Sequence, residues 1–209
     1  MLARRNAVRA LMVAAILAFF GVVCSACISE DVINETHDVL QYGQFFEDKN
    51  AAEAQRMFDI MFPPTLEPNF ENVSYHYKSI DSDADTYSFE MELSFSIADH
   101  DTMKRYLEVV TSGKPCVPLP FNEEYQICFF TKPEFWVTQC SEGHYHIEES
   151  NILAVVFDRD LNSICYVALR VFDGGGTRTE ELPEFFRRFS VDPVMFHDFC
   201  QSMKEEYQF

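Results

Sequence analysis

The chain has 209 residues, of which 47% are hydrophobic and 24% are charged. Such a composition is typical of a packed globular domain and excludes a chain that is disordered throughout. Acidic residues outnumber basic ones by 34 to 16, which gives a formal net charge of -18 at pH 7. A surface with this excess of acid repels the phosphates of nucleic acids, so we expect no nucleic-acid partner.

The amino terminus combines a short cationic stretch with a long uncharged one. Residues 1–9 contain three arginines, and residues 10–24 carry no charge and are almost wholly apolar. This order is typical of a secretory signal segment. A serine and an alanine then stand directly before Cys27. The arrangement resembles the lipobox of bacterial lipoproteins. The resemblance implies that residues 1–26 are a signal segment and that Cys27 receives a lipid such as palmitate.

Two other outcomes of this signal remain open. Ordinary cleavage near Ala26 would release the protein from the membrane. Alternatively, the segment stays as a helical anchor, since residues 10–28 are 19 residues without a charge, close to the roughly 20 that a membrane span needs. In every case the arginines stay in the cytoplasm and the remainder is exported. We expect an extracytoplasmic domain, held at the cell membrane through an amino-terminal lipid or helix.

The exported chain begins with an acidic stretch and continues as an ordered domain. Residues 27–49 are polar and acidic, and we interpret them as a tether or a loose helix. Residues 50–62 predict a helix, because Asn50 can cap it and a double proline follows it. Alternating apolar and polar residues predict strands over 73–80 and 86–98, which the polar residues between them join as a hairpin.

The second half of the chain changes between helix and strand patterns. Apolar residues at helical spacing predict an amphipathic helix over 99–112, capped by an aspartate and ended by Gly113. The proline-rich stretch 114–122 predicts a loop. Further strands are expected over residues 125–131, 135–140, 144–148, 152–157 and 164–172, and further helices over 182–189 and from Asp192 onward.

Together these elements predict a single α+β domain over residues 50–209. No internal repeat or Gly/Ser linker interrupts the pattern after residue 50. Hairpin signals between neighbouring strands favour a mostly antiparallel sheet, with the amphipathic helices packed on it.

The strand over 86–98 has the clearest pattern in the chain. Odd-numbered residues from Tyr87 to Ile97 are apolar and the even-numbered ones between them are polar. Successive side chains of a strand point to opposite faces. We therefore expect the apolar side chains, Phe89 among them, to be buried, and Glu90 and Glu92 to face solvent. Paired carboxylates serve catalysis only where a cleft perturbs one of them, so we assign these two no catalytic role.

Five cysteines follow Cys27, an odd number. Export favours oxidation. Cys128, Cys165 and Cys200 lie in apolar strand or helix patterns, where a free cysteine behaves as a small hydrophobic residue. Cys116 and Cys140 lie in or beside loops, and these are the two that we expect to pair. The pattern predicts at most two disulfides and at least one free thiol.

His144 and His146 alternate on a predicted strand and therefore share one face. With Glu148 on the same face, imidazoles and a carboxylate at this spacing could hold a transition metal, and His76 and Glu92 could complete the site if their strands were neighbours. Surface polar residues on an edge strand explain the same pattern, so we expect no metal and no other cofactor. On this interpretation His146→Ala changes the free energy of unfolding by less than about 1 kcal/mol. Metal analysis of the purified protein is then expected to find no stoichiometric zinc.

No strong catalytic motif accompanies the export signal. The residue types of a nucleophile and a base are present, but no local nucleophile motif of a known hydrolase is. The sequence therefore favours an exported, membrane-anchored, non-enzymatic module that binds an extracytoplasmic protein or a small ligand. Two alternatives remain open: a metal-dependent enzyme that uses His144 and His146, and an inhibitory or structural module of the cell envelope.

Overall fold

A computed structural model of the protein describes residues 32–42, 61–82, 86–120, 122–141, 144–172 and 182–207. These residues form an antiparallel sheet with helices packed on it, which confirms the predicted α+β fold class. The signal segment 1–26, Cys27 and the predicted helix 50–62, except for its last two residues, lie outside the described residues. No helix in the described part of the chain has the length and apolarity needed to cross a membrane.

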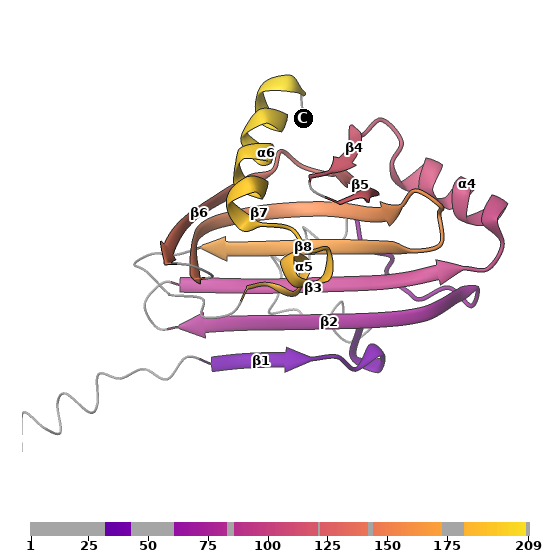
Figure 1. The fold of residues 1–209 in the computed structure, drawn as a ribbon. Coiled ribbons are helices and arrows are strands. Elements are labelled where there is room, and N and C mark those ends of the chain that lie inside the picture. The colour runs from indigo at the N-terminus through magenta and orange to yellow at the C-terminus, as the bar shows by residue number, and fades with distance from the viewer. Residues whose placement is uncertain are drawn as a thin grey trace, which may run out of the picture. The chain divides into compact units, whose positions relative to one another are not determined.

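The described residues form one eight-stranded sheet in which every pairing is antiparallel. The strands are β1 (Val32–Thr36), β2 (Phe70–Ser82), β3 (Thr86–Ile97), β4 (Cys116–Leu119), β5 (Asn122–Phe129), β6 (Glu134–Ser141), β7 (His144–Asp158) and β8 (Ile164–Phe172). Their order in the sheet is β1-β2-β3-β8-β7-β5-β4, and β6 pairs with β7 outside this path. Figure 1 shows β1, β2, β3, β8 and β7 side by side in this order.

β2 and β3 form the predicted hairpin. β3 pairs with β2 on one side and with β8 on the other, so it is an interior strand. The register places His76 opposite Glu92 and Ser79 opposite Phe89. Residues directly opposite in an antiparallel pair share a face, so His76 and Glu92 lie on one face of the sheet and Phe89 on the other. Phe89 is buried, as predicted.

β7 is longer than the sequence pattern indicates. The pattern predicts separate strands over 144–148 and 152–157, but one continuous strand covers both. Its first part pairs with β6 and its last part with β5, while β8 pairs along its other side. The polar residues 149–151 in its middle belong to the ladders with β6 and β8. The interruption of the apolar pattern therefore marks a change of partner strand and not a turn.

Aspartates cap two of the described α-helices, whereas Pro183, the residue before a third, makes no side-chain capping hydrogen bond. The side chain of Asp99 accepts a hydrogen bond from the backbone N–H of Thr102, and Asp192 accepts one from the N–H of Val194. These bonds satisfy backbone donors that the first turn of a helix leaves free. The described helical segments are the 3-10 helix η1 (Val39–Gln41) and the α-helices α4 (His100–Val110), α5 (Glu184–Arg188) and α6 (Pro193–Glu206).

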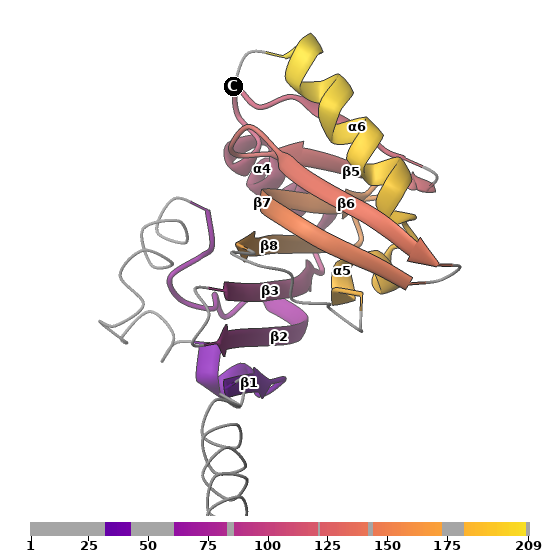
Figure 2. The same cartoon turned by 90° about the vertical axis from the view of Figure 1, so that its left-hand side faces the viewer.

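Apolar side chains are buried on both faces of the sheet. One cluster contains the apolar residues of β3 with Met103 and Leu107 of α4. The other contains apolar residues of β7 and β8 with Phe185 and Phe186 of α5 and Phe196 of α6. Figure 2 views the strands from the side and shows α5 and α6 together on one face of the sheet. Strands that are covered on both faces account for the near-continuous apolar pattern of β7 and β8.

Two segments that the sequence predicts as tether or loop contain strands. Part of the predicted tether 27–49 pairs with β2 as β1, so the folded domain includes residues before position 50. Within the predicted loop 114–122, β4 pairs with β5. Both strands lie at the ends of the sheet order. They are only five and four residues long. Such short strands depend on hydrogen bonds to a longer neighbouring strand, and their own residues show no clear alternating pattern.

Cys116 of β4 forms a disulfide with Cys128 of β5, and the predicted pairing of Cys116 with Cys140 is wrong. The two bonded cysteines are directly opposite in the β4–β5 register, with Cα atoms 4.3 Å apart. The prolines around Cys116 indicate a loop, and a loop pattern carries no information on the strand that Cys116 pairs with. Cys165 and Cys200 are free and buried, in agreement with the expectation of at least one free thiol.

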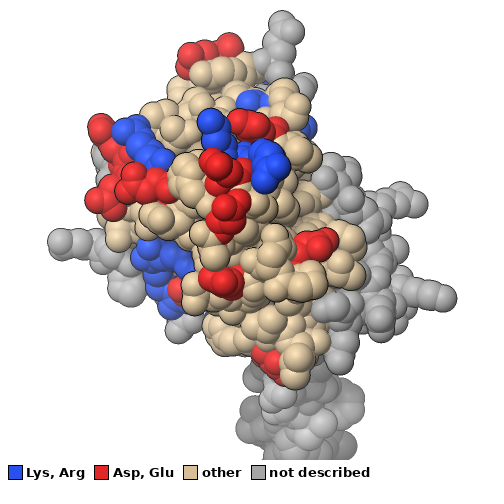
Figure 3. Space-filling view, turned by 90° about the vertical axis from the view of Figure 1, so that its right-hand side faces the viewer, with Lys and Arg blue, Asp and Glu red and all other residues tan. Residues whose placement is uncertain are grey.

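The excess of acid does not form a single negative patch on the face that Figure 3 shows. Acidic and basic side chains are interspersed there. Charge alone therefore marks no binding surface on this face.

Candidate functional site

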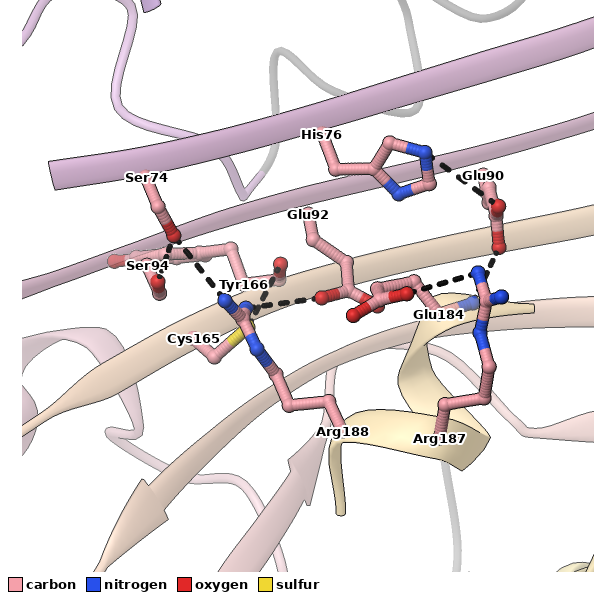
Figure 4. A network of polar contacts seen from close by, with 10 residues as sticks. All are labelled: Ser74, His76, Glu90, Glu92, Ser94, Cys165, Tyr166, Glu184, Arg187 and Arg188. Atoms are coloured by element: carbon pink, nitrogen blue, oxygen red, sulfur yellow. Dashed lines mark hydrogen bonds and ion pairs between the residues drawn. The ribbon is translucent and has the colours of Figure 1, made fainter. Parts of the chain in front are cut away.

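Polar side chains occupy the part of the sheet that adjoins α5. On the face that carries α5 and α6, the apolar residues of β7 and β8 are followed by polar residues on β3, β2 and β1. The register places Lys78 between Glu35 of β1 and Glu90 of β3. It also places His76 opposite Glu92. We call this set the polar strip, and its members are Glu35, Ser74, His76, Lys78, Glu90, Glu92 and Ser94. Figure 4 shows five of them: Ser74, His76, Glu90, Glu92 and Ser94.

Glu92 accepts a hydrogen bond from Arg188 of α5, and the contact becomes an ion pair when the carboxyl group ionises. Nη1 of Arg188 donates to Oε2 of Glu92 at 3.0 Å, and Nη2 donates to Oγ of Ser74 at 3.2 Å. The Glu92 side chain is only 2% exposed. This burial raises the pKa of Glu92 to about 8, although Arg188 acts to lower it. Its Oε1 has no hydrogen-bond partner among the described residues. Glu92 is therefore a carboxyl group that retains a proton readily near neutral pH.

Glu90 contacts the same helix through the helix backbone. Its Oε2 accepts a hydrogen bond from the N–H of Glu184, the first residue of α5, at 3.0 Å. Burial raises the pKa of Glu90 to about 7, while the N–H of Glu184 and the charge of Lys78 act to lower it. Its other oxygen, Oε1, lies 3.8 Å from Nε2 of His76. Glu90 therefore connects α5 to the middle of the polar strip.

The expectation that Glu90 and Glu92 face solvent is wrong. Both lie on the predicted face of β3, opposite to Phe89, but they are 9% and 2% exposed because α5 contacts them there. Alternation along one strand tells which side chains share a face, but not which other element packs on that face. A buried polar group needs a partner, and α5 supplies Arg188 and the N–H of Glu184. The main role of these carboxyl groups is therefore to hold α5 against β3.

At the outer end of the polar strip, Glu35 lies between two histidines. Its Oε1 is 3.4 Å from Nε2 of His37 and 3.4 Å from Nε2 of His76. The two imidazole rings are stacked, with centroids 4.5 Å apart and planes 9° from parallel. The side chain of His76 is 7% exposed, whereas those of Glu35 and His37 are 43% and 67% exposed. This Glu35–His37–His76 cluster thus joins a buried imidazole to two side chains that solvent can reach.

Burial and neighbouring charges favour the protonation states that can bind a metal, which are a neutral imidazole for His76 and an ionised carboxylate for Glu35. Burial and His37 lower the pKa of His76, against the opposing effect of Glu35. Burial acts to raise the pKa of Glu35, but Lys78 and His76 outweigh it and hold this pKa below its usual value. A neutral imidazole beside an ionised carboxylate is the donor pair that a transition metal takes. Lys78 contacts the other carboxylate oxygen, with Nζ 3.9 Å from Oε2 of Glu35.

The structure does not bring the sequence-predicted histidines together. His144 and His146 lie on β7, where the register places His146 opposite Thr138 of β6. His76 lies on β2, and β3 and β8 separate β2 from β7. Neighbouring strands are about 4.8 Å apart, so β2 and β7 are about 14 Å apart. The suggestion that His76 completes a metal site with His144 and His146 is therefore wrong.

Sequence reasoning identifies His76 as a candidate ligand but misses its neighbours, Glu35 and His37. Their spacing contains a usable signal, because residues two apart on an extended chain share a face. A segment interpreted as a tether has no neighbouring strand to pack on. The shared face of Glu35 and His37 therefore predicts no contact with His76. No family model, curated protein or solved structure matches the chain in comparisons with known proteins.

Proposed function

We propose that the protein is an exported lipoprotein, anchored through a lipid on Cys27, whose folded domain is a non-enzymatic binding module outside the cytoplasm. The observation that carries this proposal is the order of residues at the amino terminus. Cationic residues 1–9 precede the uncharged residues 10–24, and a serine and an alanine stand before Cys27. Because positive charge stays on the cytoplasmic side, the domain that follows lies on the other side of the membrane.

The geometry of the polar strip supports binding over catalysis. The side chains of Glu90 and Glu92 are only 11% and 2% exposed beneath α5, so a substrate in solvent has little access to either carboxyl group. The Cys165 thiol lies 3.4 Å from Nη1 of Arg188. It is buried, and burial raises its pKa, so it lacks the character of an activated nucleophile. These groups stabilise the domain, and the exposed end of the strip is the part that can meet a ligand.

The partner of such a module is a protein or a small ligand outside the cytoplasm. The net charge of -18 favours a cationic ligand or a basic surface over a nucleic acid. Two alternatives share the same location. A metal-dependent enzyme built on His144, His146 and nearby carboxylates would have to act without His76, because β3 and β8 separate β2 from β7. An inhibitory or structural module would be recognised by one stoichiometric protein partner, found when the anchored protein is isolated from gently solubilised membranes with its neighbours.

Cells that express the wild-type protein are expected to incorporate a fatty-acid analogue into it, whereas Cys27→Ala remains unlabelled as an unprocessed precursor. The reason is that the lipobox-like cysteine is the residue that would accept the lipid. Labelling of growing cells, followed by mass spectrometry of the amino-terminal peptide, measures both label and processing. The matched control is Cys24→Ala, three positions earlier in the same segment, which is expected to keep the label. A wild-type protein without label would eliminate the lipoprotein and leave the helical anchor or free secretion.

A further inference from the structure

His76 is a buried histidine whose ring nitrogens make no well-formed hydrogen bond to the described residues. It is 6% exposed, and both Nδ1 and Nε2 are buried without such a bond in the described part of the chain. Yet two carboxylate oxygens approach Nε2: Oε1 of Glu35 at 3.4 Å and Oε1 of Glu90 at 3.8 Å. A buried polar side chain is normally hydrogen-bonded. The convergence of carboxylate oxygens on an imidazole nitrogen that makes no well-formed hydrogen bond is what a cation-binding site presents.

The distances within the Glu35–His37–His76 cluster fit a tetrahedral metal. Zinc binds His nitrogen and carboxylate oxygen at about 2.0–2.2 Å, which places the ligand atoms of a tetrahedral site about 3.3–3.6 Å from one another. Oε1 of Glu35 lies 3.4 Å from Nε2 of each histidine. All three ligand atoms lie within 4.8 Å of one another. The side chain of His37 is 67% exposed, so it is free to turn and shorten its distance to His76.

We propose that Glu35, His37 and His76 bind one zinc ion. Two imidazoles and one carboxylate are a donor set typical of zinc, whereas calcium and magnesium prefer oxygen ligands alone. Three protein ligands leave a fourth position for water or for Oε1 of Glu90. The second oxygen of Glu90 accepts the N–H of Glu184, which fixes the orientation of this carboxylate. Lys78 is a positive charge that contacts the cluster, and it meets Oε2 of Glu35, whereas the histidines approach Oε1.

The fold explains why these three residues meet. Glu35 is on β1 and stands opposite Lys78 of β2, so it is diagonal to His76 on the same face. His37 follows directly after β1 and is two positions beyond Glu35. A zinc ion here would connect the edge strand β1 to β2 and add its binding free energy to the folded state. This site lies apart from His144 and His146 on β7, and it replaces the expectation of a protein without stoichiometric zinc.

The test uses the full-length protein, purified from membranes in detergent without a polyhistidine tag. The protein is stripped with a chelator, equilibrated with zinc chloride and dialysed, and its zinc content is measured by mass spectrometry. Competition with a chromophoric chelator gives the affinity, and cobalt(II) substitution reports tetrahedral geometry by its absorption. His37→Ala and Glu35→Gln are the informative variants because both side chains are exposed and their loss leaves the core intact. The controls are His100→Ala, an exposed histidine on α4, and His146→Ala on β7.

The wild-type protein and both controls are expected to retain one equivalent of zinc. His37→Ala and Glu35→Gln are each expected to weaken zinc binding at least roughly tenfold, because even the loss of a group that only orients a ligand costs 10–100-fold. A wild-type protein that retains no zinc would overturn the proposal, and so would zinc binding that both variants leave unchanged. Zinc loss confined to His146→Ala would overturn it in favour of the β7 histidines. The result is independent of the anchor, since Cys27→Ala can lose its lipid and still bind zinc.

Discussion

The Phe89→Ala variant is expected to unfold about 3–5 kcal/mol more easily than the wild-type protein. Phe89 is 2% exposed on β3, an interior strand, and belongs to the apolar cluster that includes Met91, Met103 and Leu107. Removing the ring leaves a cavity that the surrounding strands can fill only in part, so the lost burial and the cavity both lower stability. Urea denaturation of the purified protein, followed by circular dichroism, measures the change in the free energy of unfolding.

The matched control for this variant is Val109→Ala on α4, because Val109 is 78% exposed. An exposed apolar residue has little buried area to lose, so we expect a change of less than about 1 kcal/mol. A Phe89→Ala variant as stable as this control would mean that the alternation of β3 is assigned to the wrong faces. The register with β2, and with it the position of His76 opposite Glu92, would then be wrong as well.

The elements with strong local signals are the ones that the sequence predicts correctly. Alternation over residues 86–98 predicts β3 and its hairpin partner, and Asp99 and Asp192 mark the starts of α4 and α6. β1 and β4 are missed because they are short edge strands whose hydrogen bonds come from one longer neighbour. The Cys116–Cys128 disulfide is missed for the same reason, since it depends on the pairing of β4 with β5.

The candidate site is predicted less completely than the fold, because it depends on which strands and helices are neighbours. His76 is recognisable from the sequence, but its partners are on β1 and not on β7. Local pattern shows that Glu90 and Glu92 share a face, yet their burial depends on α5, about ninety positions later in the chain. Strand order and the packing of a distant helix are tertiary properties that no local periodicity contains.

The stability of the wild-type protein is expected to fall as the pH rises from about 5 to about 8, and Glu92→Gln is expected to reduce this fall. Burial raises the pKa of Glu92 to about 8 in the folded protein, from an ordinary value of 4.5. Below pH 4.5 both states are protonated and the contribution of Glu92 to stability is complete. Between the two pKa values the unfolded chain loses its proton while the folded protein keeps it, so stability declines until the pH exceeds the folded pKa.

The charged groups around Glu92 determine how large this effect is. Arg188 of α5 contacts it at 3.0 Å and stabilises its ionised form, while Glu90 and Glu184 oppose ionisation. His76 stands opposite Glu92 on β2. With the side chain 2% exposed, we expect Glu92 to account for about 2–5 kcal/mol of the stability lost across this pH range.

Urea denaturation at pH 5, 7 and 9 measures the difference between the wild-type protein and Glu92→Gln at each pH. Glutamine keeps the size of the side chain and cannot titrate, so the variant is expected to gain stability relative to wild type as the pH rises. Groups that do not interact with Glu92 contribute equally to both curves and cancel in the difference, whereas Glu90, which opposes the ionisation of Glu92, does not cancel fully. The control is Glu123→Gln on β5, an exposed glutamate whose curve should run parallel to that of the wild type. A Glu92→Gln curve that also runs parallel would show that Glu92 ionises normally and that its pairing with Arg188 outweighs its burial.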